Sequence, residues 1–141
     1  MKPHLVVGPP HKPYMLRWHL LPRNPFLNIY LHKFLNDDDD RALHDHPWPS
    51  VSIMLRGAAR EVLAEQGKWT LSRDIKAGRV VWRSAMFRHR LVILTQPTWT
   101  LFITGPRIRE WGFWCDGTRF VRWDKFTDPN DPGQIGKGCD Q

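Results

Sequence analysis

Long apolar runs are missing from this sequence. None approaches the roughly 18 consecutive apolar residues of a membrane-spanning helix, although apolar residues make up 41% of the 141 residues. The N-terminus also lacks the apolar stretch of a secretory signal, because Gly8, Pro9, Pro10 and Pro13 interrupt it. We therefore expect a cytoplasmic protein that makes no contact with a membrane.

Cysteine is scarce as well. The 2 cysteines, Cys115 and Cys139, are far apart in the chain and form neither a disulfide framework nor a Cys-x-x-Cys pair. We expect both to be ordinary reduced thiols. The sequence thus predicts no cysteine chemistry.

Several common functional motifs are absent. The chain has neither a Walker A nor a GxGxxG sequence, so these loops give no support for nucleotide binding. The acidic residues 37–40 lack the alternating ligands and the glycine of a calcium-binding loop, which favours a solvated turn. The serines near the histidines, Ser50 and Ser52, lack the elbow motif of a hydrolase nucleophile.

Positive charge is in excess. The net charge is +7 and the pI is about 9.9, which is typical of proteins that bind anions or nucleic acids. Lysine and arginine are nevertheless spread along the chain, and arginine dominates the middle, where it suits planar pairing with carboxylate or phosphate. Charge alone leaves open whether the anion is a small molecule or a polymer.

Helical periodicity is the last notable absence. Instead, short runs of strand-forming residues alternate with glycine, proline and acidic turns. This even spacing is typical of an all-β sandwich or barrel. The sequence predicts strands at residues 27–34, 49–56, 59–64, 68–73, 79–83, 88–95, 98–104, 110–115 and 119–123.

The strand pattern defines one domain with two extensions. Residues 1–26 are proline-rich and irregular, although residues 18–21 fit a short strand. Residues 27–126 contain the predicted barrel. Residues 127–141 are rich in glycine and proline and poor in apolar residues, so we expect a flexible tail there.

Three histidines have the spacing of metal ligands. His44 and His46 are two residues apart, so on a strand their side chains project from the same face. His89 lies on a distant predicted strand and can supply a third imidazole. Such a set leaves positions open on a metal ion for water, substrate or oxygen. The remaining histidines have no partner at ligand spacing and are interpreted as surface or packing residues: His4, His11, His19 and His32.

The glycines around these histidines resemble the two motifs of the cupin superfamily. In the first motif, G-x5-H-x-H-x3,4-E-x6-G, His44, His46 and Gly57 are in register, whereas Asp38 replaces the first glycine and Ser50 the glutamate. In the second, G-x5-P-x-G-x2-H-x3-N, Gly78 and His89 are in register. Three other positions of that motif differ and hold Ser84, Met86 and Ile93. Both matching glycines are expected at turns that need a positive φ angle.

The resemblance covers about residues 27–115 and implies a single jelly-roll barrel. Small uncharacterised cupin-like proteins of bacteriophages and bacteria share the segments LHDHPW, RHRL and TLFITGPRxREWGF with this chain. Because Ser50 replaces the usual glutamate, the ligands would be three neutral histidines, as in thiol-dioxygenase-like cupins. That set leaves the metal charge uncompensated and favours an anionic substrate.

Three further residues are candidates for roles around the metal. Asp45 would point away from the histidines and is interpreted as a turn residue or a partner behind the ligands. Glu110 is a candidate fourth ligand or general base, although an ion pair with Arg107 or Arg109 is the commoner arrangement. Either Trp82 or Arg83 points into the barrel. The resemblance favours Arg83, which would bind an anion there, while an exposed Arg83 stays the alternative.

The function implied by the resemblance is that of a metal-dependent enzyme. We expect Fe(II), with Zn, Mn or Ni as alternatives, and an oxygenase-like reaction on a small anionic substrate, or else an isomerase or hydrolase. A non-catalytic metal-binding or ligand-binding cupin is the first alternative. A barrel that binds single-stranded nucleic acid is the second, with bases stacking on Trp82, Trp99, Trp111 and Trp114. A homodimer is compatible with the exposed aromatic residues that we expect.

Overall fold

The computed structural model describes residues 1–37, 42–66 and 68–140, with the side chains of residues 131–134 also left out. Within these ranges the protein is almost entirely β-structure, and its helix α1 (Trp123–Phe126) has 4 residues. The expected all-β fold is therefore confirmed. No helix in the described ranges is long and apolar enough to cross a membrane.

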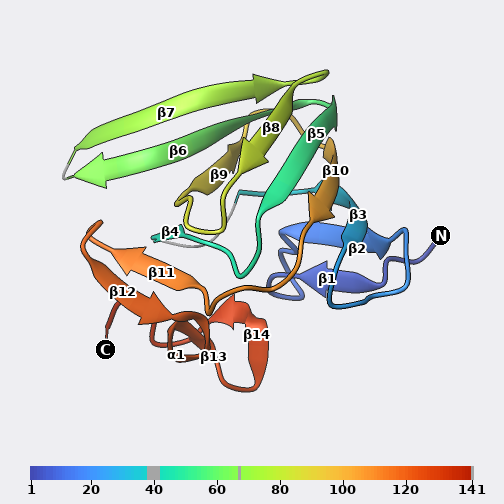
Figure 1. Ribbon diagram of the computed structural model, residues 1–141. Helices are drawn as coiled ribbons and strands as arrows, with labels where there is room; N and C mark the ends of the chain where they lie inside the picture. Colours follow the sequence, from blue (N-terminus) through green and yellow to red (C-terminus); the bar gives the residue numbers. More distant parts are fainter. Residues whose placement is uncertain (38–41, 67, 141) are drawn as a thin grey trace.

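The largest sheet has six antiparallel strands in the order β1-β2-β3-β10-β5-β8 (Figure 1). Their bounds are β1 (Leu5–Val7), β2 (Met15–His19), β3 (Asn28–Phe34), β10 (Thr98–Thr104), β5 (Ser50–Arg56) and β8 (Val80–Arg83). This order places strands side by side that are far apart in the sequence. In the pair of β3 with β10, for example, Leu31 lies opposite Leu101.

Two three-stranded sheets and a hairpin complete the fold (Figure 1). The first sheet contains β7 (Trp69–Lys76), β6 (Ala58–Gln66) and β9 (Arg90–Ile93), and the second contains β12 (Arg119–Arg122), β11 (Gly112–Cys115) and β4 (Leu43–His44). The hairpin pairs β13 (Thr127–Asp128) with β14 (Asp131–Ile135). All nine strands predicted between residues 27 and 123 have a counterpart among these.

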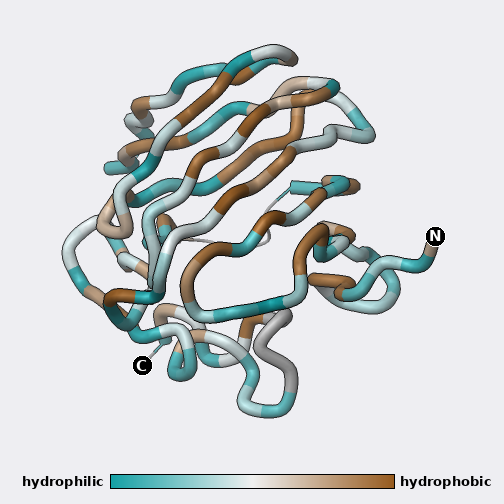
Figure 2. The backbone as a smooth tube through the Cα atoms, turned by 45° about the vertical axis from the view of Figure 1, so that its right-hand side comes forward, coloured by the Kyte–Doolittle hydropathy of each residue, from teal (hydrophilic) through white to brown (hydrophobic). Residues whose placement is uncertain are grey.

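Alternating side chains create the core. On β3, Tyr30, His32 and Phe34 are buried, whereas Leu31 and Lys33 are not, because successive side chains of a strand point to opposite faces. Figure 2 shows the matching alternation of apolar and polar residues along the strands. Buried residues of the six-stranded sheet and of the β7-β6-β9 sheet meet in one apolar cluster: Met15, Phe34, Met54, Ala59, Ile75, Val81 and Ile93.

The two turn glycines of the cupin motifs have the predicted conformation. Gly57 has a φ angle of 88° and Gly78 one of 93°. Gly57 lies between β5 and β6, and Gly78 between β7 and β8. Both therefore occupy corners where an L-residue with a side chain is strained.

The N-terminal segment is more regular than expected. Strands β1 and β2 extend the six-stranded sheet beyond β3. The strand expected at residues 18–21 lies earlier, because β2 pairs with β3 from Met15 opposite Phe34 to His19 opposite Tyr30. Met15 and Trp18 of β2 are buried.

The C-terminal segment also differs from the prediction. The expectation of two reduced thiols is wrong, because Cys115 and Cys139 form a disulfide with Cα atoms 5.8 Å apart. The expected flexible tail instead contains the β13–β14 hairpin. Phe126 next to it is buried and stacks on Phe113 at 3.7 Å between ring centroids. Since disulfides persist in oxidising surroundings, the cytoplasmic location stays a prediction.

The solvated turn expected at the acidic residues 37–40 is described only in part, because residues 38–40 lie outside the described ranges. Position 38 of the first motif is among them. Asp37 is described, and its carboxylate accepts a hydrogen bond of 2.7 Å from the backbone N–H of Ile93. That bond ties the segment after β3 to the end of β9.

Candidate metal centre

Backbone pairing brings the three histidines together. His44 at the end of β4 and His89 just before β9 exchange two backbone hydrogen bonds, of 2.9 and 3.0 Å. The backbone N–H of His46 donates to the carbonyl of Ala85 at 3.0 Å. The segment 44–46 therefore runs beside residues 85–89, and the fold supplies the closeness that the sequence spacing only suggests.

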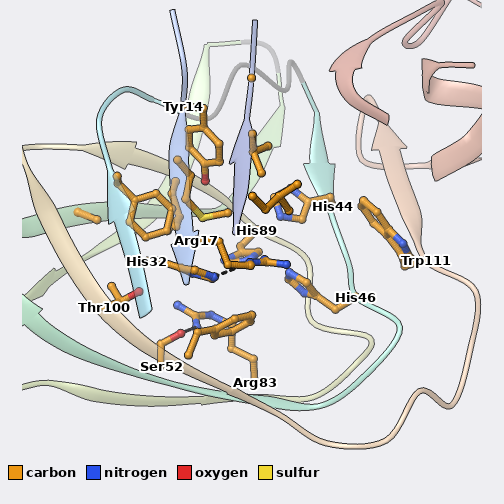
Figure 3. Close-up of a pocket in the computed structure, with 18 of the residues that line it drawn as sticks. Tyr14, Arg17, His32, His44, His46, Ser52, Arg83, His89, Thr100 and Trp111 are labelled. Atoms are coloured by element: carbon orange, nitrogen blue, oxygen red, sulfur yellow. Dashed lines mark hydrogen bonds between the residues drawn. The ribbon is translucent and has the colours of Figure 1, made fainter. Parts of the chain in front are cut away.

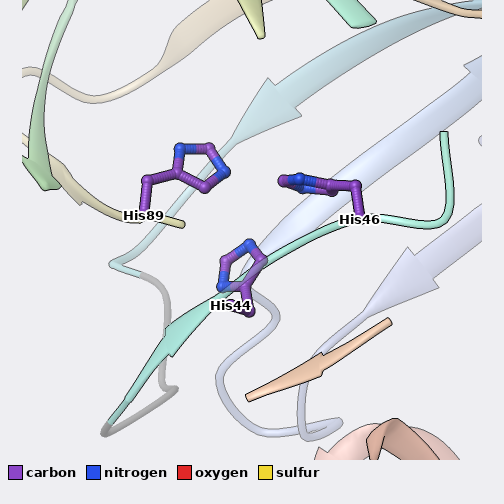
Figure 4. A group of neighbouring side chains, drawn as sticks. All are labelled: His44, His46 and His89. Carbon is purple, nitrogen blue, oxygen red and sulfur yellow. The ribbon is translucent and has the colours of Figure 1, made fainter. Parts of the chain in front are cut away.

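The imidazole rings converge on one point (Figure 4). Their ring centroids are 4.9 to 5.1 Å apart, and one nitrogen from each ring lies within 4.8 Å of the others. Two nitrogens on the same ion, each about 2.1 Å from it, are separated by about 3 to 4 Å. The cluster is close to this geometry.

The protonation and hydrogen bonding of the cluster fit a metal ion. Among the described residues, the buried Nδ1 of His46 and Nε2 of His89 have no hydrogen-bond partner. Buried polar atoms rarely lack a partner, and a metal would supply one. Burial lowers the pKa of His46 well below its usual range and the pKa of His89 to about 4. Both rings are thus neutral, which is the form that binds metals.

A buried glutamate on β6 supports His89 from behind. Glu61 is fully buried, and its carboxylate accepts hydrogen bonds of 2.6 Å from Nδ1 of His89, from Nε of Arg83 and from Nε of Arg73. Burial alone would raise the pKa of Glu61. The His89 hydrogen bond and the Arg83 charge outweigh burial and hold the pKa well below its usual range.

Glu61 thereby sets the orientation of His89. Its bond to Nδ1 places the ring proton there and leaves Nε2 available for a metal, an arrangement typical of histidine ligands. Glu61 belongs to no motif of the sequence and was not among the predicted site residues. Strand parity could have indicated that Glu61 points inward, because it lies two residues from the buried Ala59 on β6 and so shares its face.

Arg83 points inward, as the resemblance favoured. It is 3% exposed, whereas Trp82 is 67% exposed. Its guanidinium bonds to Glu61 and to the hydroxyl of Ser52, at 2.6 and 2.7 Å. Its charge is therefore paired with a carboxylate of the protein itself, which differs from the expected role of binding an anion.

Asp45 anchors the segment that carries two of the histidines. It is 1% exposed and accepts hydrogen bonds from the backbone N–H of Gly112 and from the indole of Trp114. Arg109 pairs with Asp45 at 3.0 Å and also donates to the carbonyl of His46 at 3.0 Å. Asp45 thus joins the 44–46 segment to β11, and the described cluster of ligand atoms does not include it.

Glu110 does not lie at the cluster, contrary to its proposed role as a fourth ligand or general base. Its carboxylate is about half exposed and pairs with Arg107 at 3.1 Å. Hydrogen bonds lower the pKa of Glu110, and the bond from the Trp123 indole has a larger effect than the bond from Arg107. Arg107 and Glu110 are only three residues apart in the segment after β10, so their side chains meet locally.

The histidines face a cavity of about 790 Å³ (Figure 3). Its described lining contains no aspartate or glutamate and four arginines, which are Arg17, Arg23, Arg83 and Arg107. His32 is buried and packs against Tyr30, Phe34 and Phe102, as its interpretation as a packing residue predicts, and it also lines the cavity. Sequence parity could have placed it inward, because Tyr30 and Phe34 share its face.

The four tryptophans proposed as stacking platforms are dispersed. Trp111 lines the cavity and stacks on Trp123, and Trp99 stacks on Trp18. Trp114 lies under the guanidinium of Arg88, 3.3 Å from its ring centroid. The contacts of these three rings are thus with other side chains of the protein.

Two comparisons of the sequence with known proteins found no match. No protein-family model matches the sequence, and no curated protein matches it.

Several solved structures are similar. A cupin superfamily protein from Desulfitobacterium hafniense is 18% identical, with a TM-score of 0.52 over 67% of this chain and 78% of its own. A Klebsiella pneumoniae protein with a double-stranded β-helix domain is 16% identical, with a TM-score of 0.54 over 77% and 90%. HppE, solved in its Fe(II) form, is 16% identical, with a TM-score of 0.57 over 71% and 54%.

The protein therefore has the cupin fold, and the predicted jelly-roll barrel is confirmed. Identities of 16 to 18% establish the fold alone. The chemistry has to be argued from the three histidines and the cavity that they face.

Proposed function

We propose that this protein is a metal-dependent enzyme of the Fe(II) oxygenase type that acts on a small anionic substrate. One observation carries the proposal: three converging histidines face a cavity whose described lining holds four arginines and no carboxylate. Imidazoles suit a divalent transition metal. Arg83 and Arg107 pair with glutamates, whereas Arg17 and Arg23 have no carboxylate partner among the described residues and suit an anion beside the metal.

Each residue of the cluster would have its own role at the metal. His44, His46 and His89 would hold the metal, and Glu61 would keep His89 in the tautomer that binds it. Bound Fe(II) would supply coordination positions for oxygen and substrate. The apolar side chains of Phe34, Leu91 and their neighbours would limit access of water.

Metal content tests the site. We expect the wild type to hold about one equivalent of divalent metal after reconstitution with Fe(II), Mn(II), Zn(II) or Ni(II), and a His44→Ala/His89→Ala variant to hold almost none. The exposed His11 supplies a control, since His11→Ala should keep the metal of the wild type. Equal metal in the wild type and the double variant would refute the site.

Oxygen consumption tests the reaction. With Fe(II) bound, the wild type should consume oxygen in the presence of at least one member of a panel of small acids and thiols, and the double variant should not.

A non-catalytic metal-binding or ligand-binding module is the second candidate. Among the described residues, the carboxylate nearest the cluster is that of Glu61, and three donors already occupy it. The cavity lining thus offers no described carboxylate for proton transfer, which favours binding without turnover. Binding of panel members without oxygen consumption would support this candidate.

A further inference from the structure

A second polar pair lies in the same cavity as the histidine cluster. Arg17 of β2 is directly opposite His32 of β3 in the antiparallel register. Both residues line the cavity, and Figure 3 shows them joined by a hydrogen bond in the pocket that contains the labelled histidines. The strands β2 and β3 therefore contribute a wall of the cavity.

The partners of Arg17 are neutral. Its Nε–H donates to Nε2 of His32 at 2.9 Å. Burial and the charge of Arg17 hold the pKa of His32 well below its usual range, so His32 is an uncharged acceptor. The guanidinium also lies over the ring of Tyr30, 4.4 Å from its centroid. No carboxylate of the described residues pairs with Arg17, and burial lowers its pKa.

Arg83 differs from Arg17 in this respect. Both arginines line the cavity, but Glu61 neutralises Arg83. A partly buried charge without a counter-ion carries a desolvation cost, and an anionic ligand would relieve that cost. Arg17 is thus better suited than Arg83 to bind an anion, although the resemblance favoured Arg83 for that role.

The geometry of Arg17 also indicates the kind of anion. His32 occupies Nε, which leaves the two Nη groups at the end of the guanidinium for a ligand. Two parallel N–H donors match the two oxygens of a carboxylate. Apolar side chains of the same cavity, among them Val7, Met15 and Phe34, would surround a short hydrocarbon chain.

We propose that Arg17, held in place by His32, binds the carboxylate of a small organic acid whose other end faces the histidine cluster. The proposal rests on the proposed function, because it names the class of anionic substrate and the residue that receives it.

Binding of butyrate tests the proposal. NMR titration of the full-length protein, both loaded with Zn(II) and treated with a chelator, should show saturable binding of butyrate and much weaker binding of the neutral butyramide. Arg17→Gln should weaken butyrate binding by about 10- to 100-fold in both states, since it removes a charge-assisted pair. Arg56→Gln removes an exposed arginine outside the cavity lining and should change nothing.

Two further variants guard against a folding defect. Arg17→Lys keeps the charge but loses the planar pair of donors, so it should fold and bind butyrate about tenfold more weakly. His32→Leu should weaken binding as well, because Arg17 loses the acceptor that orients it.

Three results would overturn the proposal: no butyrate binding to the wild type, equal binding by the wild type and Arg17→Gln, or a clear preference for inorganic phosphate. The chelated protein separates this test from that of the metal site. Failure of metal binding alone would leave the dependence on Arg17 intact, whereas failure of the Arg17 proposal would leave the metal content unchanged.

Discussion

Among single residues, Glu61 holds the most consequential position that the structure reveals. It connects a metal-ligand candidate, His89, to two arginines, and it is fully buried. Within the barrel, the carboxylate both orients His89 and neutralises Arg83. Removing its charge should therefore affect the metal and the fold together.

We predict that Glu61→Gln weakens metal affinity by about 10- to 100-fold. It should also lower the free energy of unfolding by roughly 3 to 5 kcal/mol, because Arg83 would stay buried without its counter-ion. Metal titration and urea denaturation measure the two effects. Glu65→Gln, on the same strand, breaks a partly exposed pair with Arg90 and should cost less than about 1 kcal/mol. Wild-type metal affinity in Glu61→Gln would contradict the orienting role.

His32 should make stability depend on pH. Its folded-state pKa is lowered by burial and by Arg17, whereas in the unfolded chain it is about 6.5. As the pH falls below about 6.5, the unfolded state takes up a proton that the folded state does not, so stability decreases. The stabilisation is present above that pH and is lost on acidification.

We predict that the wild type loses more stability than His32→Leu between pH 7.5 and 5, by up to about 1.4 kcal/mol per pH unit. Urea denaturation of the chelated proteins at several pH values measures this. Parallel pH profiles for the two proteins would show that His32 titrates normally.

Among the structural elements, the turns at Gly57 and Gly78 make a matched pair. Both glycines have positive φ angles, of 88° and 93°. A Cβ at Gly57 would lie 2.5 Å from Oγ1 of Thr98 and 2.7 Å from Oγ1 of Thr95, whereas a Cβ at Gly78 would meet nothing within 4 Å. The turn between β5 and β6 is therefore constrained twice, by backbone conformation and by packing.

We expect Gly78→Ala to lower the free energy of unfolding by roughly 1 to 2 kcal/mol, the backbone cost alone. Gly57→Ala should cost at least about 1 kcal/mol more, because the two threonines must move as well. Urea denaturation of both variants measures the two losses of stability. Equal losses would mean that the threonine side chains move aside at no cost in free energy.

For the molecule as a whole, the disulfide between Cys115 and Cys139 fastens the C-terminal segment to β11. Thr127 and Ile135 of that segment line the cavity. The bond closes a loop with a sequence separation of 24, which restricts the unfolded chain. The C-terminal segment is thereby linked both to stability and to one wall of the cavity.

We predict that Cys139→Ser lowers the free energy of unfolding by roughly 3 kcal/mol. Chemical denaturation with and without reductant measures it. A reductant should bring the wild type to the level of the variant and leave the variant unchanged. If the reductant leaves the wild type unaffected, the disulfide does not form in solution.

Local pattern was sufficient for much of the fold. The alternation of residues 27–34, the turn glycines Gly57 and Gly78, and the spacing of His44 and His46 are all properties of neighbouring residues, so they could be interpreted without a structure. His89 was within reach because a motif connects it to Gly78. The strands and the histidine set were predictable for this reason.

Long-range pairing accounts for the rest. Three features depend on which strands become neighbours: the counter-ion of Arg83, the partner of Arg17 and the bond between the cysteines. Strands that are neighbours in this fold can be far apart in the sequence. Strand parity assigns a side chain to a face and leaves its partner undefined. Alternation along the chain and the resemblance to the cupin motifs therefore predicted a β-barrel with three histidines. The packing of the strands determined which of the cavity's arginines are paired with a carboxylate.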